Sequence, residues 1–316
     1  MKVVIKSMVS VLMPAYNCEP YIVAAITSIL QQTHTNLELL ICDDGSSDRT
    51  WELINTFTDS RIAKYKNGEN KGYLFTYNFL LNKANGEFIT CQDADDWSDI
   101  TRLEQQLSIF VKFPDIYLCG CNGTFYYSEV VQRPCPEFES GIVKLRNANF
   151  NFMLPAVLYK REVLAQVSGF HNFFDRLTGM DQYFILSIIS NFKSYELNSY
   201  LYFARFNSTS NHRTFDSLRK MTAPDVYFFL RKQRVETGTD WLDQGREDLI
   251  YEFENKLLGS KQYMAEKYRE YAVYRIDSGQ LTAGFELLLV ALRKWPFNRS
   301  IYRTIVYALR KLFTSQ

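Results

Sequence analysis

The sequence lacks the features that mark membrane-spanning, secreted and nucleic-acid-binding proteins. No run of about 18 apolar residues occurs, and residues 1–10 carry two lysines without the apolar core of a signal peptide. The formal net charge is only +1, so no overall positive field attracts nucleic acid. We therefore expect no signal peptide, no membrane span and no nucleic-acid partner.

The cysteines also lack a metal-binding or redox pattern. Six are present, but none forms a C-x-x-C pair, and most lie in apolar, strand-like segments. Such cysteines are typical of buried free thiols in a reducing compartment, so we expect a cytoplasmic protein. Hydrophobic residues make up 47% of the 316 residues, which indicates a globular chain with one large domain and an appendage, or with two domains.

The first third of the chain alternates short apolar runs with helical patterns. The runs predict strands over residues 9–13, 37–42 and 88–91, and helices are predicted over 20–32, from near 49, over 73–84 and up to 110. This alternation favours a mostly parallel, Rossmann-like α/β sheet flanked by helices on both faces. Ligands are expected beyond the C-terminal ends of its strands.

The pattern changes twice further along the chain. After Pro114 it is less regular, with candidate strands over residues 117–127, 153–159 and 200–206. From about residue 214 it predicts only helices, over residues 224–236, 247–259, 262–278, 283–294 and 299–313. We therefore expect one α/β domain over residues 1–213 and a helical C-terminal region over residues 214–316.

An acidic turn follows the predicted strand 88–91. Asp93, Asp95 and Asp96 place alternating carboxylates where one hard divalent cation, Mg²⁺ or Mn²⁺, could be held together with a diphosphate. The alternative is an exposed turn that caps the next helix. The metal site is favoured because this is the third polar loop in succession at a strand end.

Four segments in this order resemble the family 2 inverting glycosyltransferases, which have the GT-A type of fold. They are residues 9–17, 42–48, 70–72 and 93–96, and residues 28–33 and 84–89 are similar to that family's connecting segments. The likeness covers about residues 8–112. It implies a metal-dependent glycosyltransferase that moves a sugar from a nucleotide diphosphate sugar, by default a UDP sugar, to an acceptor hydroxyl. Residues 1–112 would form the nucleotide-sugar part and residues 113–213 the acceptor part.

The resemblance also implies which residues border the nucleotide. Pro14, Tyr16 and Asp44 would lie against the base and ribose. A planar base favours a ring such as Tyr16 beside it and a carboxylate such as Asp44 to accept its ring N–H, whereas the alternative for Tyr16 is ordinary core packing. The other implied donor contacts of the first loop are Asn17 and Glu19.

The acidic turn is the implied diphosphate end of the donor site. Asp93, Ala94 and Asp95 would form the donor-binding motif, and Asp95 or Asp96 would contact the Mn²⁺ or Mg²⁺. Arg205 and His212 are candidates to reach the pyrophosphate, although a lone histidine is usually structural.

One carboxylate in the second half is the candidate catalytic base. Residues 169–170 and 179–184 are similar to the family segment in which two adjacent acids open a helix and the second is the base. Met180 replaces the first acid and Asp181 keeps the base position. The alternative is that Asp181 only caps the helix. We favour the base because an inverting transfer requires a general base on the acceptor side.

Two departures from the family pattern bear on function. Tyr77 stands where many relatives carry a basic residue, so Lys71 is a candidate for the missing positive charge. The Gln-x-x-Arg-Trp signature of processive polymer synthases is absent. We therefore expect transfer of a single sugar to a glycan or lipid-linked acceptor, in cell-surface polysaccharide or glycan synthesis.

Two rival functions remain open from the sequence. A nucleotidyltransferase would also use a metal held by carboxylates, but it would normally need a glycine-rich, basic loop after the first strand, and residues 14–17 supply neither. A non-catalytic protein that binds a nucleotide sugar or a partner is compatible with the Met180 departure and with the helical C-terminal region.

The C-terminal segment suggests a membrane partner. After Glu286 the chain has no acid but has aromatic and apolar residues among six cations, Arg293, Lys294, Arg299, Arg303, Arg310 and Lys311. This composition predicts peripheral contact with an anionic membrane, at its inner face. The alternative is a terminal helix that packs on the catalytic domain with its charges in water.

Overall fold

The structure, a computed structural model, describes residues 6–127, 131–143, 153–205 and 217–314. The chain divides into two compact units. The first comprises Met1–Asn207 and Arg234–Gly238, and the second comprises Ser208–Gln233 and Thr239–Gln316. The described residues contain no helix that is both long and apolar enough to span a membrane.

The first unit is built on a mixed sheet. The described residues contribute ten strands to it. The strand order is β3-β2-β1-β4-β9-β6-β10-β5, with β7 beside β6 and β8 beside β10. Neighbours are parallel from β3 to β4, the part that the alternating pattern predicted, whereas β9 is antiparallel to both β4 and β6. The strands are β1 Val9–Ala15, β2 Leu37–Asp43, β3 Ile62–Lys66, β4 Phe88–Cys91, β5 Trp97–Ser98, β6 Leu118–Tyr126, β7 Gln132–Pro134, β8 Gly141–Ile142, β9 Val157–Lys160 and β10 Ser194–Arg205.

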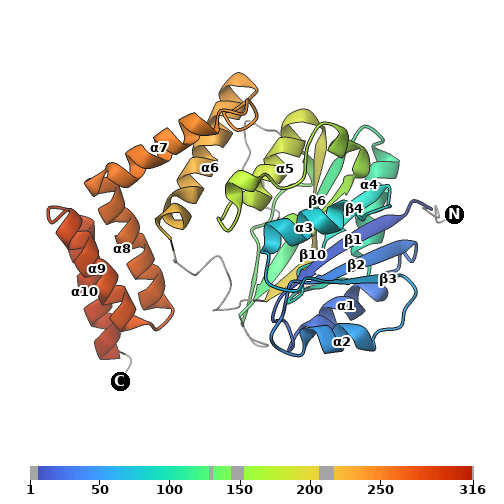
Figure 1. Cartoon of the computed structure of the whole chain (residues 1–316), viewed down its shortest axis with the longest axis horizontal. Helices are drawn as coiled ribbons and strands as arrows, with labels where there is room; N and C mark the ends of the chain where they lie inside the picture. The colour runs from blue at the N-terminus through green and yellow to red at the C-terminus, as the bar shows by residue number, and fades with distance from the viewer. Residues whose placement is uncertain (1–5, 128–130, 144–152, 206–216, 315–316) are drawn as a thin grey trace. The chain divides into compact units, whose positions relative to one another are not determined.

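Helices cover both faces of this sheet. Val9, Val11 and Met13 of β1 pack into a core with α1, α2 and α4 on one face, and Figure 1 shows α3 and α5 on the other. β1 is therefore buried on both sides, which explains its continuous apolar run. The helices are α1 Ile22–Leu30, α2 Thr50–Thr56, α3 Tyr73–Leu81, α4 Arg102–Lys112 and α5 Met180–Asn191, with short 3₁₀ turns at Leu154–Ala156, Arg161–Ala165 and Asn172–Phe174.

Several predicted bounds differ from the structure for identifiable reasons. The strand expected from residue 153 begins only at Val157, because Pro155 lies in the preceding 3₁₀ turn. The helix expected from Pro224 begins at Leu218, since the hydroxyl of Ser217 accepts a hydrogen bond from the Lys220 N–H and caps an earlier start. All six cysteines are free and five are buried, as predicted.

The second unit is helical. Its helices are α6 Leu218–Thr237, whose last turn from Arg234 is grouped with the first unit, α7 Glu247–Gly259, α8 Lys261–Asp277, α9 Leu281–Lys294 and α10 Arg299–Thr314. Helices α8, α9 and α10 share a buried core of alanine, isoleucine and leucine side chains. A Cβ on Gly284 of α9 would meet Ile276 Cγ1 of α8 at 2.5 Å, so these two helices approach closely where Gly284 lies.

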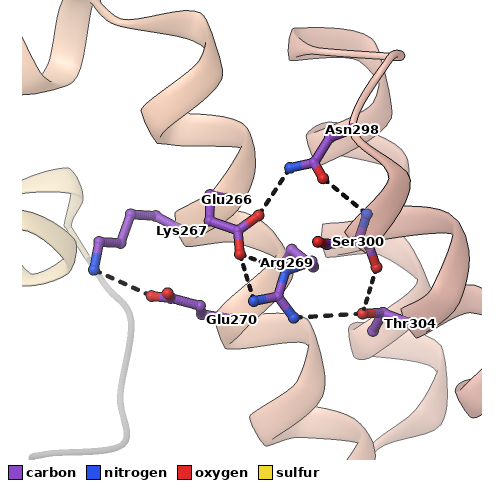
Figure 2. Close-up of polar contacts among 7 residues, drawn as sticks. All are labelled: Glu266, Lys267, Arg269, Glu270, Asn298, Ser300 and Thr304. Carbon is purple, nitrogen blue, oxygen red and sulfur yellow. Dashed lines mark hydrogen bonds and ion pairs between the residues drawn. The ribbon is translucent and has the colours of Figure 1, made fainter.

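A polar network fastens the start of α10 to α8 (Figure 2). The Glu266 carboxylate accepts hydrogen bonds from Arg269 Nε, at 2.8 Å, and from Asn298 Nδ2, also at 2.8 Å. The Asn298 side chain in turn accepts a hydrogen bond from the Ser300 N–H at the start of α10. Hydrogen bonds from Arg269 hold the pKa of Glu266 below its usual value. The loop between α9 and α10 therefore has a defined path.

The close approach at Gly86 predicts a stability effect. A Cβ on Gly86 would lie 2.6 Å from the Ser10 nitrogen and 2.8 Å from the Met8 oxygen, both backbone atoms at the start of β1. We expect Gly86→Ala to destabilise the first unit by about 1–3 kcal/mol, because backbone must move to admit the methyl group. Gly68→Ala is the matched control, since nothing lies within 4 Å of its Cβ position. Calorimetric unfolding of both variants measures the difference, and equal midpoints would contradict the packing argument.

Candidate active site

The candidate site lies where β1, β2 and β4 end. Pro14 is buried within β1, opposite Cys42 of β2, and not in the loop that follows. Pairing of β1 with β4 stops at Leu12, so Pro14 lies where the strand has lost one neighbour and its missing N–H is tolerated. Tyr16 is the first residue beyond the strand, and its side chain is 45% exposed. Pro14 and Tyr16 were both predicted to border the base, and only Tyr16 has an exposed ring.

The loop after β1 is braced against the loop after β2. Asn17 has a positive φ of 50°, and its side-chain oxygen accepts a hydrogen bond from the Ser47 N–H at 2.9 Å. The Glu19 N–H donates to Asp48 at 3.0 Å, while the Glu19 carboxylate accepts from the Arg49 N–H at 3.2 Å. The side chains of Asn17 and Glu19, predicted as donor contacts, are thus engaged in shaping the two loops.

Asp44 holds a third loop in place. Its Oδ1 accepts hydrogen bonds from Asn67 Nδ2 at 2.6 Å and from the Lys71 N–H at 3.0 Å, and its Oδ2 accepts one from the Gly72 N–H at 2.8 Å. Gly72 has a φ of 94°, a conformation that favours glycine. A carboxylate has about four acceptor positions, and these donors use three of those of Asp44, which is 3% exposed. The Lys71 ammonium lies 4.8 Å from the centroid of the Phe75 ring at the surface.

The acidic loop after β4 is held by the end of β10. Tyr202 OH donates to Asp96 Oδ2 at 2.7 Å, and the Arg205 N–H donates to Asp96 Oδ1 at 2.7 Å. Both oxygens of the buried Asp96 are therefore occupied by protein donors. The Asp95 carboxylate differs, because among the described residues its only hydrogen bond comes from its own backbone N–H. Of these two predicted metal ligands, Asp95 is the more open to a ligand.

The three carboxylates share a crowded, water-poor environment. Burial, the neighbouring Asp95 charge and the Asp181 charge together raise the pKa of Asp93 to about 7. Burial, with the charges of Asp93 and Asp95, raises the pKa of Asp96 well above its usual value, and burial also raises that of Asp95. Negative charge is thus in excess here, and a bound cation would relieve it.

The described residues contain no group of three or more carboxylate, histidine or cysteine side chains arranged as a complete metal site. Mg²⁺ is usually bound by only one or two carboxylates, with substrate phosphates and water supplying the rest. The open Asp95 carboxylate and the excess of negative charge fit a cation that is completed by a diphosphate. Ala94, predicted as part of the motif, is buried in the core beneath the loop.

Arg205 is the cation closest to the acidic loop among the predicted residues. Its Nη1 donates to the Asp95 carbonyl oxygen at 2.6 Å, and its charge lowers the pKa of the Asp95 carboxyl, partly offsetting the effect of burial. The guanidinium lies 4.4 Å from the Trp97 ring centroid and 5.0 Å from that of Tyr21. His212, the other candidate for the pyrophosphate, falls outside the described residues.

Asp181 lies in the first turn of α5 and is half-buried. Gly179 directly before the helix has a φ of 96°, so the chain turns sharply into this helix. Asp181 is close enough to the acidic loop for its charge to raise the pKa of Asp93. The structure therefore brings together two carboxylates that are 88 positions apart in the sequence.

Three further residues contribute that sequence reasoning did not assign. Tyr202 binds Asp96, and Tyr73 OH donates to Asp93 Oδ1 at 3.2 Å. Arg176 has a positive φ of 53°, and its Nη2 donates to the Asn70 carbonyl oxygen at 3.3 Å, so it brings a second cation to the loop that contains Lys71. Among 45 phenylalanine and tyrosine residues, neither tyrosine had a distinguishing pattern.

Tyr77, which replaces a basic residue of many relatives, is part of the core. It is fully buried, its ring stacks on Phe170 with centroids 4.1 Å apart, and its hydroxyl pairs with that of Tyr159 at 3.1 Å. This position is therefore not exposed at the site, although its ring stacks on that of Tyr73 with centroids 6.3 Å apart. Lys71 and Arg176 remain the cations nearest to the loop that Asp44 holds.

A hollow of about 960 Å³ lies elsewhere on the first unit. Its lining includes Leu81, Phe88, Arg161 and Val167. Because β4 begins at Phe88, this hollow is at the opposite end of that strand from the acidic loop. It contains none of the residues described above for the site.

Comparisons with known proteins identify the family. The family model described as glycosyl transferase family 2 matches residues 10–171, just over half of the chain. A UDP-Glc:alpha-D-GlcNAc-diphosphoundecaprenol beta-1,3-glucosyltransferase of Escherichia coli is 38% identical over 117 residues, which are 35% of this chain and 47% of that protein. The glycosyltransferase GlyG of Streptococcus pneumoniae is 31% identical over 229 residues, which are 66% of this chain and 73% of that protein. The match to the E. coli relative thus spans about half of that relative's length.

A solved structure extends the likeness to the fold. The crystal structure of S. aureus TarS 1–349 in complex with UDP-GlcNAc matches with a TM-score of 0.58 and 18% identity, over 92% of this chain and 74% of that chain. The predicted α/β fold of the GT-A type is therefore confirmed. With its ordered strand-end loops, its mixed sheet and these relatives, the chain belongs to glycosyl transferase family 2.

Proposed function

We propose that the chain is an inverting glycosyltransferase that moves a single sugar from a UDP sugar to an acceptor hydroxyl. Family membership supports sugar transfer. The observation that carries the proposal is the placement of Asp181, whose charge raises the pKa of Asp93 in the acidic loop. A candidate base on α5 therefore lies near enough to the acidic loop to influence it electrostatically.

The donor end of the site suits a nucleotide. The exposed Tyr16 ring offers a face for a base, and the remaining acceptor position of Asp44 would accept a ring N–H. The E. coli relative is named for UDP-Glc, and TarS was solved with UDP-GlcNAc, which supports uridine as the donor base. The bracing of the loops by Asn17 and Glu19 would keep the nucleotide pocket in shape before the donor arrives.

The acidic loop suits the diphosphate. Asp95 would hold a divalent cation, Mn²⁺ or Mg²⁺, while Asp96 stays bound to Tyr202 and Arg205 and fixes the loop. When bound, the cation supplies positive charge that offsets the charge developing on the leaving diphosphate. Arg205 adds a fixed positive charge beside the same loop.

Asp181 is the proposed catalytic base. It would accept the proton of the acceptor hydroxyl as that oxygen attacks the anomeric carbon from the side opposite to the leaving diphosphate, and inversion follows from this geometry. It lies in the first turn of α5, where the helix N-terminus carries partial positive charge. Met180, in place of a first acid, removes one competing negative charge from this turn.

The acceptor is proposed to be a lipid-linked glycan. The E. coli relative is named for a diphosphoundecaprenol-linked acceptor, which supports this class. Such an acceptor is met at a membrane surface, so the predicted position at the inner, cytoplasmic face of a membrane belongs to the same proposal. A screen of UDP, GDP and dTDP sugars with Mn²⁺ or Mg²⁺, scored by release of nucleotide diphosphate, tests the function. Binding of a donor without any release would favour the non-catalytic alternative.

The open carboxylate of Asp95 predicts a loss of metal-dependent donor binding. We expect Asp95→Asn to weaken Mn²⁺-dependent UDP binding by about tenfold or more and to lower turnover, because a neutral amide is a poorer ligand for a hard cation. Isothermal titration with UDP, with and without Mn²⁺, measures the effect. Asp115→Asn is the matched control, since Asp115 forms an exposed surface pair with Lys193. Unchanged Mn²⁺ dependence in Asp95→Asn would refute the assignment.

The proposed base predicts a different kinetic signature. We expect Asp181→Asn to lower kcat by about two to four orders of magnitude while UDP-sugar affinity changes little, because the carboxylate acts on the acceptor in the transition state. Steady-state kinetics and donor titration separate the two quantities. A collapse of donor binding would instead place Asp181 in the donor site or in the folding of α5.

A further inference from the structure

We propose that one face of α10, with the loop before it, is a docking surface for an anionic lipid bilayer. The proposal goes beyond the proposed function, because it concerns the helical unit and involves no residue of the candidate active site. It assigns the membrane contact predicted from the composition of residues 293–316 to particular side chains.

Helix α10 has an anchored face and an exposed face. Ile301 and Ala308 are fully buried in the core shared with α8 and α9, and Thr304 is bonded within the network of Figure 2. This side of the helix is therefore occupied by its own unit. Tyr307 and Lys311 are bonded to Asp277 of α8, so the exposed side that remains is the one that carries Tyr302 and Val306.

An apolar stripe runs along the exposed side. Its residues follow one another at helical spacing of four, three and four, which places them in one row. All four are exposed, and Phe313 at the end of the row is 74% exposed; they are Tyr302, Val306, Leu309 and Phe313. Exposed apolar rows of this length are unusual on a soluble surface and mark a contact site.

The loop before α10 extends the stripe with two rings. Phe297 is 82% exposed, the largest value among the exposed large hydrophobic residues of the described chain, and Trp295 lies beside it with ring centroids 6.4 Å apart. Tyr302 OH donates to the Pro296 carbonyl oxygen at 2.9 Å, which ties this loop to the start of the stripe. The Asn298 side chain also fixes the path of this loop, because it donates a hydrogen bond to Glu266 of α8.

A row of cations accompanies the stripe. Arg299, Arg303 and Arg310 each precede a stripe residue by three positions, so they lie along its flank. Arg299 and Arg303 are exposed, and neither forms an ion pair with a described residue. The nearest acid in sequence, Glu286, is on α9, and Asp277 of α8 is already paired with Lys311. Arg299 and Arg303 therefore carry positive charge on this flank without a compensating carboxylate among the described residues.

These two rows together fit a bilayer surface. Rings and aliphatic side chains can enter the boundary between headgroups and acyl chains while arginines stay at the anionic headgroups. A protein partner would need a matching groove with acidic flanks. Anionic lipid is therefore the proposed occupant of this surface. The experiments below also detect self-association of the chain.

Vesicle sedimentation of the full chain tests the proposal. The vesicles contain phosphatidylcholine alone or mixed with phosphatidylglycerol, at low and at high salt, and no nucleotide sugar is present. We expect binding only to the anionic vesicles, and we expect that binding to weaken as salt rises while the apolar stripe retains part of it. A chain that stays in the supernatant with anionic vesicles at low salt would overturn the proposal and leave the proposed catalytic function untouched.

Two double variants test the rows separately. We expect Arg299→Gln with Arg303→Gln to weaken anionic binding by about thirtyfold, from about 1 kcal/mol for each cation at the surface. Phe297→Ser with Phe313→Ser should abolish the binding that persists at high salt. Phe228→Ser is the matched control, because Phe228 of α6 is also an exposed ring, 56% exposed, outside the surface. Binding of both double variants as tight as that of the unaltered chain would reject this face.

Fluorescence locates the contact within the unit. Trp295 is one of four tryptophans, and it is the one at this surface. Addition of anionic vesicles should shift the emission to shorter wavelength in the unaltered chain and in Trp241→Phe, but not in Trp295→Phe. A shift retained in Trp295→Phe would place the contact elsewhere. Sedimentation velocity without lipid detects whether the chain forms a dimer. If the unaltered chain dimerises but does not bind vesicles, and the variant with Phe297→Ser and Phe313→Ser does not dimerise, the face belongs to a second copy of the chain.

Discussion

The Asp96 carboxylate is the junction on which the candidate site depends. It accepts one hydrogen bond from the Tyr202 hydroxyl and one from the Arg205 N–H, and so it joins the loop after β4 to the end of β10. Together with the pairing of β5 and β10 and the bond from Arg205 Nη1 to the Asp95 carbonyl oxygen, this junction fixes the acidic loop against the second half of the sheet. A buried carboxylate is costly unless it is hydrogen-bonded, and these two donors make the burial of Asp96 tolerable. Asp95, the residue before it, keeps its carboxylate open.

The carboxylates of the candidate site differ in role because their hydrogen-bond partners differ. Asp44 and Asp96 are almost fully buried and serve mainly as acceptors for the protein's own donors, whereas Asp95 and Asp181 are half-buried and less engaged. The first pair positions loops, and the second pair is free to meet a ligand. The sequence alone could not separate these roles, because all four residues occur in loops or at a helix start after apolar runs.

The fold was more predictable from the sequence than the site. Helix α7 was predicted at its observed bounds, residues 247–259, because its apolar spacing and flanking glycine and serine are unambiguous. Strand β3 was missed, since it is only half-buried and carries Lys64 and Lys66, and β5 has only two residues. The approach of Asp181 to Asp93 and the bond from Tyr202 to Asp96 arise from the sheet order, in which β10 lies between β6 and β5. No local pattern encodes that order.

The helical unit has its own core and its own polar network, and no side chain of the acidic loop takes part in either. The solvent side of α10 supplies none of the hydrogen-bond partners that the described residues give to Asp44 and Asp96. Selection can alter the surface charge of this terminal helix in one lineage and the loops at the strand ends in another, with little interference between the two. Where such a protein works in the cell and which sugar it handles are then free to evolve as separate traits.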